Sequence, residues 1–322
     1  MKKLNVRIGV YAALLLSCLG LVTACNEEIG MPGTITTSPV QPSGPKPDYA
    51  PTIDPQMQAV IEQFVSYGTP PLPTLSPRQA RMAPSVTDAV VGLLVKYGIK
   101  PSPQNLTISQ RVIPNAAPDG TLIRIYTPTN ATGPLPVIVY YHGGGWVIGS
   151  LDVYDPSCRA LAGRSQAIVV SVDYRLSPEN KFPAAHEDAY SAYAWVKANA
   201  ATIGGNPAKV AVAGESAGGN MAAAVCLLAK QRGLALPIHQ LLVYPVANND
   251  LNTASYNQYA NAVPLNRPGI QYFVANYFNS PADGDNQLIS LVDVADLSGL
   301  PPATIVGAEI DPLQTEGMEL AD

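Results

Sequence analysis

Charged residues are scarce in this sequence, and their scarcity excludes one class of protein. Only 13% of the 322 residues are Asp, Glu, Lys or Arg, whereas 47% are hydrophobic. The net charge is -5, and no block of like charge stands out. Nucleic-acid-binding proteins carry a basic patch or stripe, so we expect no nucleic-acid partner. The hydrophobic content is enough to bury a sizeable core, which argues against a disordered chain.

Cysteine and histidine are also few, with four and three residues. They do not cluster at the spacing of a metal site, so we expect neither a metal nor another cofactor. Two of the cysteines, Cys18 and Cys25, belong to the N-terminal segment. The others, Cys158 and Cys226, lie in Ala- and Leu-rich segments with a helical pattern. We therefore predict that Cys158 and Cys226 are buried free thiols.

Residues 1–24 have the organisation of a signal peptide. A basic stretch at residues 2–7 precedes an apolar run at residues 8–21, which is too short to span a membrane comfortably. The small residues before Cys25 resemble the lipobox of bacterial lipoproteins. This predicts export to the cell envelope, with a lipidated Cys25 as a membrane tether on the periplasmic or outer-membrane face. The alternative is ordinary secretion with cleavage after Ala24.

Residues 25–55 predict a proline-rich tether between this N-terminus and the globular part. Seven prolines stand between residues 32 and 55, interleaved with Thr, Ser and Gly. Such a composition favours an extended polyproline-like chain. The globular domain is then expected over residues 56–322.

From residue 56 onward, the hydrophobic pattern alternates between helix and strand. Helical spacing occurs at Met57–Tyr67 and Val86–Tyr97, and half-buried strands at Leu106–Ile113 and Thr121–Tyr126 flank a turn at Pro118–Gly120. Short apolar strands follow at Pro136–Tyr141, Ala167–Val172, Val210–Ala213, Leu241–Tyr244 and Ala303–Val306. Because helical stretches separate these strands, we predict an α/β fold with a mostly parallel sheet covered by helices on both faces.

Two glycine-rich motifs follow predicted strands. The segment VAVAGESAGGN places Ser216 between a strand and an apolar helix, which is the context of a nucleophile elbow. A glycine-rich structural turn is the alternative for this motif. The segment YYHGGGWVIGS exposes backbone N–H groups after another strand, as an oxyanion hole requires. A phosphate-binding loop is disfavoured there, because no Lys followed by Ser or Thr completes a P-loop.

Five segments together carry a resemblance to a known family: HGGGWVIGS, VVSVDYRLSPENKFPAAHEDAYSAYAWV, VAVAGESAGGNMAAA, QLLVYPV and LSGLPPATIVGAEIDPLQTEGM. In this order they resemble the hormone-sensitive-lipase family of α/β-hydrolases, which are carboxylesterases. The resemblance runs from about Thr52 to the last residue. It implies an α/β-hydrolase fold and a cap over the acyl pocket, formed by the helices before residue 105 and by Tyr259–Phe278.

The resemblance also implies roles for individual residues. Ser216 would be the nucleophile and Asp311 the acid of a catalytic triad. The oxyanion hole would be formed by the backbone N–H groups of Gly143, Gly144 and Ala217. The substrate would be a small-molecule ester with a short acyl chain.

The triad histidine is missing from this pattern, because no histidine follows Asp311. The family orders its triad as Ser, acid and then His. Each histidine present is expected to have another role: His142 orders the glycine loop, His186 lies on a helix beside the sheet, and His239 begins a strand. We therefore expect a C-terminally truncated carboxylesterase whose last strand and helix are missing, leaving the Ala303–Val306 edge exposed and the chain prone to aggregation. The alternative is a non-catalytic relative that binds a small ligand, or an inactive fragment.

Overall fold

The computed structural model describes residues 40–114 and 117–322, and the strands of this part form one seven-stranded sheet in the order β1-β2-β4-β3-β5-β6-β7. The strands are β1 Leu106–Ile113, β2 Thr121–Pro128, β3 Leu135–Tyr141, β4 Ile168–Asp173, β5 Gly205–Glu215, β6 Gln240–Val243 and β7 Ala303–Val306. The β1-β2 and β2-β4 pairs are antiparallel, whereas the neighbours from β4 through β3, β5 and β6 to β7 are parallel. The mostly parallel sheet that the sequence predicts is confirmed.

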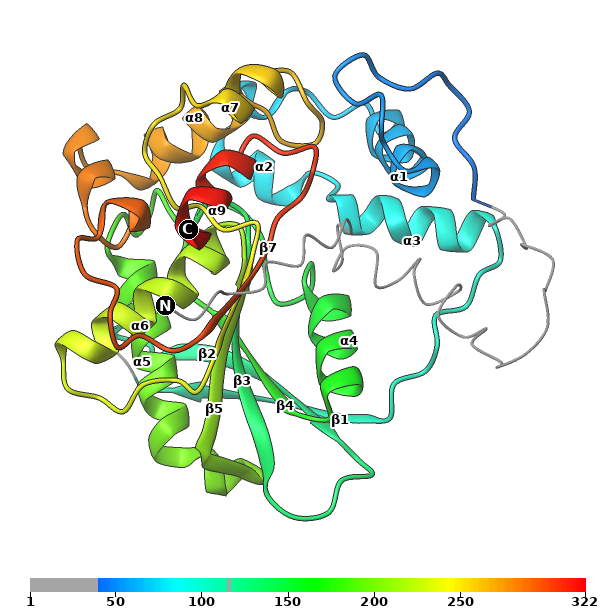
Figure 1. Cartoon of the computed structure of the whole chain (residues 1–322). Coiled ribbons are helices and arrows are strands. Elements are labelled where there is room, and N and C mark those ends of the chain that lie inside the picture. The colour runs from blue at the N-terminus through cyan, green and yellow to red at the C-terminus, as the bar shows by residue number, and fades with distance from the viewer. Residues whose placement is uncertain (1–39, 115–116) are drawn as a thin grey trace.

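Helices cover both faces of the sheet (Figure 1). They are α4 Asp155–Ser165 on one face, and α5 Ala184–Asn199 and α6 Ala217–Gln231 on the other. The principal core lies between the sheet and α5 and α6, where Val139, Val170 and Val212 are fully or almost fully buried. This explains why the central strands read as continuous apolar runs.

A second group of helices gathers at one end of the sheet (Figure 1). It contains α1 Pro55–Ser66, α2 Pro77–Met82, α3 Val86–Lys96, α7 Ala254–Gln258 and α8 Arg267–Tyr277. Local sequence fixes where these helices begin: Asp54 caps α1, whereas Ser85 and Asp88 form a capping box on α3. A last helix, α9 Gln314–Ala321, follows β7. The segments predicted to form a cap, the helices before residue 105 and Tyr259–Phe278, thus lie at the same end of the sheet. Helix α7 lies there too, just outside the predicted bounds.

The end of the predicted tether packs against these helices. Val40 is buried with residues of α1 and α3, and Ala50 and Ile53 are buried with Ile61 of α1. The prolines in this stretch do not prevent packing, because the apolar residues between them have a surface to cover. Residues 1–39, which contain the predicted signal peptide and Cys25, lie outside the described part. In the part that is described, none of the helices has the length and hydrophobicity to cross a membrane.

Candidate active site

Ser216 stands at the sharp turn that joins β5 to α6. Its φ of 56° and ψ of -119° place a non-glycine residue in a strained conformation. The Ser216 N–H donates to the carbonyl of Val243 at 2.9 Å, and its carbonyl accepts from Asn220 N at 3.0 Å. The neighbouring strand and the following helix therefore both hold the turn. This is the geometry that the nucleophile-elbow motif predicts.

Glycines make this turn possible because the backbone on either side approaches too closely for a side chain. A Cβ added to Gly214 would lie 2.1 Å from the carbonyl oxygen of Gly218. A Cβ added to Gly218 would lie 2.0 Å from the carbonyl oxygen of Tyr141, at the end of β3. The two motifs predicted from sequence are thus in direct backbone contact, and both lie at the carboxyl end of the parallel strands.

The glycine loop after β3 lies beside the serine. A Cβ on Gly143 would stand 3.4 Å from Ser216 Cβ. Gly144 has a φ of 111°, and a Cβ there would meet the carbonyl oxygen of Ile148 at 2.2 Å. Gly145 has a φ of 57° and lies under the ring of Phe273 from α8. Side chains are therefore excluded at these three glycines, and the loop backbone passes close to Ser216 at Gly143.

The expected oxyanion donors occupy two elements. Ala217 is the first residue of α6 and is fully buried, so its N–H belongs to the positive end of that helix. The Gly143 backbone hydrogen bonds to the hydroxyl of Tyr154. An oxyanion at this position would compete with Tyr154 for Gly143, whereas Gly144 and Ala217 provide the other expected donors.

Asp311 follows β7 and is buried. Its Oδ1 accepts a hydrogen bond from the Leu313 N–H at 2.9 Å. Burial raises the pKa of this carboxyl to about 7, and the Leu313 hydrogen bond opposes the shift only in part. A carboxyl whose pKa is raised in this way lacks the cationic neighbour that would favour its charged form.

Tyr244 connects Asp311 to the serine side of the site. It follows β6, between the strands that carry Ser216 and Asp311, and its N–H donates to the carbonyl of Val306. Its hydroxyl donates to Glu215 Oε2 at 2.8 Å, and the charge of Asp311 contributes to raising the pKa of Tyr244. Ser216 and Asp311 thus follow β5 and β7 at the same edge of the sheet, separated by the β6 strand end.

His142 and His186 are buried, and neither of them hydrogen bonds to the Ser216 hydroxyl. His142 Nδ1 lies 2.7 Å from the Gly143 carbonyl oxygen and 3.1 Å from the Tyr174 hydroxyl. His186 Nε2 lies 2.9 Å from Asn220 Oδ1, and its Nδ1 lies 2.7 Å from the Tyr277 hydroxyl. Burial lowers the pKa of each imidazole to about 4. At neutral pH both imidazoles are therefore uncharged, and Nε2 of His142 is buried without a hydrogen-bond partner in the described part.

His239 lies at the opposite end of the strands. It immediately precedes β6, and its Nε2 lies 2.9 Å from Thr304 Oγ1 at the start of β7. Ser216 and Asp311 follow the carboxyl ends of β5 and β7. All three histidines of the chain belong to the described part, and none of them hydrogen bonds to the Ser216 hydroxyl there.

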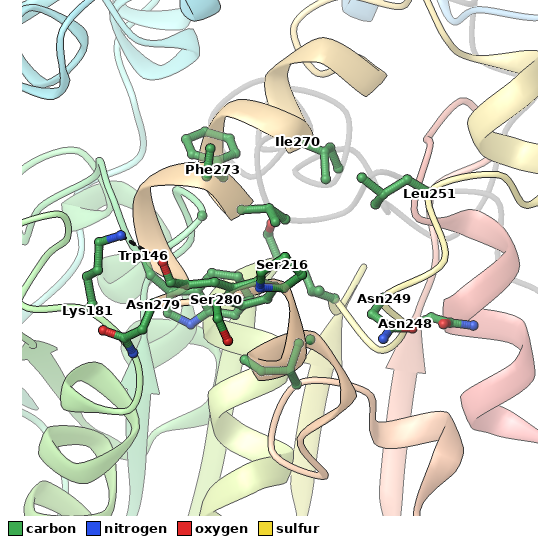
Figure 2. A pocket seen from close by; sticks show the side chains of 18 of the residues that line it. Trp146, Lys181, Ser216, Asn248, Asn249, Leu251, Ile270, Phe273, Asn279 and Ser280 are labelled. Atoms are coloured by element: carbon green, nitrogen blue, oxygen red, sulfur yellow. Dashed lines mark hydrogen bonds between the residues drawn. The ribbon is translucent and has the colours of Figure 1, made fainter.

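Ser216 lines a pocket of about 440 Å³ under α8 (Figure 2). Much of its wall is apolar, formed by side chains such as Leu251, Ile270 and Phe273. Figure 2 shows Trp146, Lys181, Asn279 and Ser280 to one side of Ser216, with Asn248, Asn249 and Leu251 to the other. The pocket is thus mainly hydrophobic, with polar groups toward both sides of the serine, as is typical of small-molecule sites.

Several buried polar residues that support the site were not singled out by the sequence. Glu215 accepts hydrogen bonds from the hydroxyls of Tyr140 and Tyr244 directly behind Ser216. Asn220 donates to the carbonyls of Val246 and Ile289 in addition to its contact with His186. The motif GESAGGN contains both Glu215 and Asn220, but their partners lie on other segments, so only the fold reveals these contacts.

The cysteine and metal predictions concern other parts of the structure. Cys158 and Cys226 are free and buried in α4 and α6, which confirms the prediction for both thiols. Across residues 40–114 and 117–322, His, Cys, Asp and Glu form no group of three or more that could hold a metal ion.

A strained serine elbow, an adjoining glycine loop and an acid after the last parallel strand together define an α/β-hydrolase type of architecture. The chain belongs to this family, because the family model described as an alpha/beta hydrolase fold matches residues 138–322. This agrees with the resemblance that its motifs carry.

Several relatives found by sequence are esterases by name. The chain is 47% identical over 198 residues to a carboxylesterase, NlhH, of Mycobacterium tuberculosis, covering 61% of this chain and 62% of that protein. It is 40% identical over 197 residues to an arylesterase of Saccharolobus solfataricus, covering 61% of this chain and 63% of that protein. The chain therefore spans less than two thirds of the length of either relative.

Solved structures of esterases share the fold. An esterase of the archaeon Pyrobaculum calidifontis is 38% identical with a TM-score of 0.74, and the match covers 84% of each chain. A thermostable esterase of Pseudomonas putida is 34% identical with a TM-score of 0.76, covering 84% of this chain and 83% of the other. The similarity thus extends well beyond the catalytic motifs.

Proposed function

We propose that this protein is a serine carboxylesterase that hydrolyses small esters. The observation that carries the proposal is the strained Ser216 elbow, which stands against the Gly143 loop and opens into a mainly apolar pocket. The esterase names of the relatives and of the solved structures support it. The limited volume and apolar wall of the pocket favour short acyl chains.

In the proposed reaction, Ser216 Oγ attacks the ester carbonyl and forms a tetrahedral intermediate. Backbone N–H groups of Gly143, Gly144 and Ala217 stabilise its oxyanion, and loss of one such donor typically costs about 3 kcal/mol of transition-state stabilisation. The alcohol leaves with a proton, and water then hydrolyses the acyl-enzyme. The chemistry that we propose requires no cofactor.

The base in this mechanism is proposed to be a histidine outside the present 322 residues, oriented by Asp311. Two findings support this: none of His142, His186 and His239 hydrogen bonds to Ser216, and the Asp311 carboxyl has a raised pKa without a cationic partner in the described part. An imidazolium beside Asp311 would lower the pKa of that carboxyl. Without the base, serine is a weak nucleophile and activity falls by orders of magnitude.

Imidazole rescue tests this assignment with the 322-residue protein. Hydrolysis of p-nitrophenyl butyrate is measured with and without added imidazole, and the same reactions with the Ser216→Ala variant provide the background. We expect a slow, Ser216-dependent rate that imidazole increases. Equal rates for the two proteins at every imidazole concentration would remove Ser216 from its role. An in-frame histidine codon after codon 322 of the gene would identify the natural base.

A second candidate function is non-catalytic binding of a small ligand. The observation in its favour is that no histidine of the chain hydrogen bonds to Ser216, although the pocket is formed. A stop codon directly after codon 322, together with no imidazole-dependent turnover, would favour this candidate.

We further propose that the protein is exported and held at the cell envelope by a lipid on Cys25. The signal-like N-terminus and the lipobox-like residues before Cys25 support this. Metabolic labelling with a palmitate analogue tests it, with Cys25→Ala as the unlabelled control. Label that persists in the Cys25→Ala variant would contradict lipidation at this residue.

A further inference from the structure

One wall of the pocket contains a buried hydrogen-bond donor without an acceptor. Trp146 is 2% exposed and lines the pocket, and its buried indole Nε1 has no hydrogen-bond partner in the described part of the chain. Its ring stacks on Tyr277 with the centroids 4.5 Å apart and the planes 10° apart, which fixes the orientation of the indole. A buried donor without a partner costs free energy, so a ligand atom that accepts from it gains affinity.

The same wall carries a cation without a carboxylate partner. Lys181 lines the pocket, and its Nζ donates to the Phe278 carbonyl at 2.7 Å (Figure 2). Lys181 forms no ion pair with any residue of the described part of the chain. One hydrogen bond leaves two of the three N–H groups of the ammonium for other acceptors.

The acidic residue that is hydrogen-bonded to this wall is already engaged. Asp283 Oδ2 accepts from the Asn279 N–H at 2.7 Å and from Asn279 Nδ2 at 3.0 Å. The hydroxyl of Ser280, which also lines the pocket, adds another group that can donate. The wall thus offers donors and a positive charge on one side of Ser216. The other side carries Leu251 and the uncharged Asn248 and Asn249, whose Nδ2 groups donate to carboxylates (Figure 2).

We infer that this wall, formed by Trp146, Lys181 and Ser280, binds a carboxylate carried by the substrate. The substrate class is then a half ester of a dicarboxylic acid: the ester carbonyl lies at Ser216 and the free carboxylate lies at Lys181. This inference rests on the proposed esterase function for the placement of the ester. Charge-assisted hydrogen bonds are the strong ones in partly buried sites, so Lys181 contributes most of the selectivity.

Binding measurements test this without depending on turnover. Monoethyl glutarate and the neutral ester ethyl pentanoate are titrated into the Ser216→Ala protein by isothermal titration calorimetry. We expect the half ester to bind about tenfold more tightly or better. Lys181→Met should abolish the preference for the half ester. Trp146→Phe, which keeps an aromatic ring but removes the N–H, should reduce the preference by a smaller factor.

Lys197→Met is the matched control, because Lys197 Nζ also donates to a backbone carbonyl, that of Pro207 at 2.6 Å, but does not line the pocket. It should leave the preference intact. Equal binding of the two esters, binding of neither, or a preference that survives Lys181→Met would overturn the inference. The imidazole rescue of Ser216-dependent hydrolysis does not depend on Lys181, so failure of the esterase proposal is recognised separately.

Discussion

Different interactions hold the two halves of the candidate site, the turn around Ser216 and the segment around Asp311. Around Ser216, backbone atoms meet so closely that Gly214 and Gly218 admit no side chain. Around Asp311, one hydrogen bond from Leu313 holds the carboxyl, and Gly317 in the following helix has nothing within 4 Å of an added Cβ. The serine half is therefore fixed by steric contact, whereas the acid half is governed by electrostatics and has free space nearby.

Because of this difference, we expect the two halves to tolerate different changes. A sterically fixed turn is sensitive to volume, because an added side chain meets backbone atoms. A buried carboxyl without a cationic partner is sensitive to pH and to any group that arrives beside it. Three pairs of variants test this contrast.

The largest effect is expected from adding a methyl group to the serine half. In Gly218→Ala, the new Cβ would lie 2.0 Å from the Tyr141 carbonyl oxygen, so β3 and the elbow must separate. We expect a loss of roughly 3 kcal/mol or more of unfolding free energy. Urea unfolding followed by circular dichroism measures it.

The matched change in the acid half is Gly317→Ala, which lies inside α9 and meets no atom within 4 Å. It should stabilise the protein by about 0.5–1 kcal/mol, because Ala favours a helix over Gly. Similar destabilisation by Gly218→Ala and Gly317→Ala would contradict the steric contrast.

The next effect is the pH dependence contributed by Asp311. Its folded-state pKa is about 7, against an ordinary value of 3.8, so the folded state favours the protonated carboxyl. The stability from this group is complete below about pH 4 and is lost as pH rises toward 7, by a few kcal/mol. Asp311→Asn should remove this loss, so its stability relative to the wild type should increase from pH 4 to 7.

Urea midpoints at several pH values for the wild type and for Asp311→Asn check this prediction. Asp119→Asn is the control, because Asp119 is exposed in the turn between β1 and β2 and should follow the wild type throughout. If the difference in unfolding free energy between the Asp311→Asn variant and the wild type stays constant across this pH range, the pKa of Asp311 is not raised in the folded protein.

The smallest effect concerns Tyr244, which joins the two halves. Tyr244→Phe removes the hydroxyl that donates to Glu215 and leaves the ring in place. We expect a loss of about 1–2 kcal/mol of unfolding free energy, because a buried carboxyl loses one donor. Tyr190→Phe should change stability by less than about 0.5 kcal/mol, since the contact of Tyr190 with Arg232 is through its ring. Equal effects of the two variants would show that the Glu215 hydrogen bond contributes nothing.

The sheet was largely predictable because its strands are short, apolar and bounded by turns. The predicted strand Leu106–Ile113 coincides with β1, and Ala303–Val306 coincides with β7, which forms an edge of the described sheet. The predicted strand at Val210–Ala213 is shorter than β5, which begins at Gly205, because Asn206 and Pro207 do not read as strand residues. Helix α2 was not predicted, since six residues are too few for a helical period to show.

The candidate site also has a part that was predictable from the sequence and a part that was not. Ser216 and Gly143 were predictable because each lies in a glycine motif directly after a strand, where a turn leaves little conformational choice. The wall formed by Trp146 and Lys181 was not, because its geometry depends on contacts far apart in the chain, such as that between Lys181 and Phe278, 97 residues away. The buried position of Val40 was hidden by the prolines around it.

The contact of Phe273 with Gly145 has a consequence for how substrate enters. Because Gly145 has no side chain, α8 rests directly on the loop that is expected to bind the oxyanion. An outward displacement of α8 that admits an ester would therefore also remove the contact between the Phe273 ring and that loop.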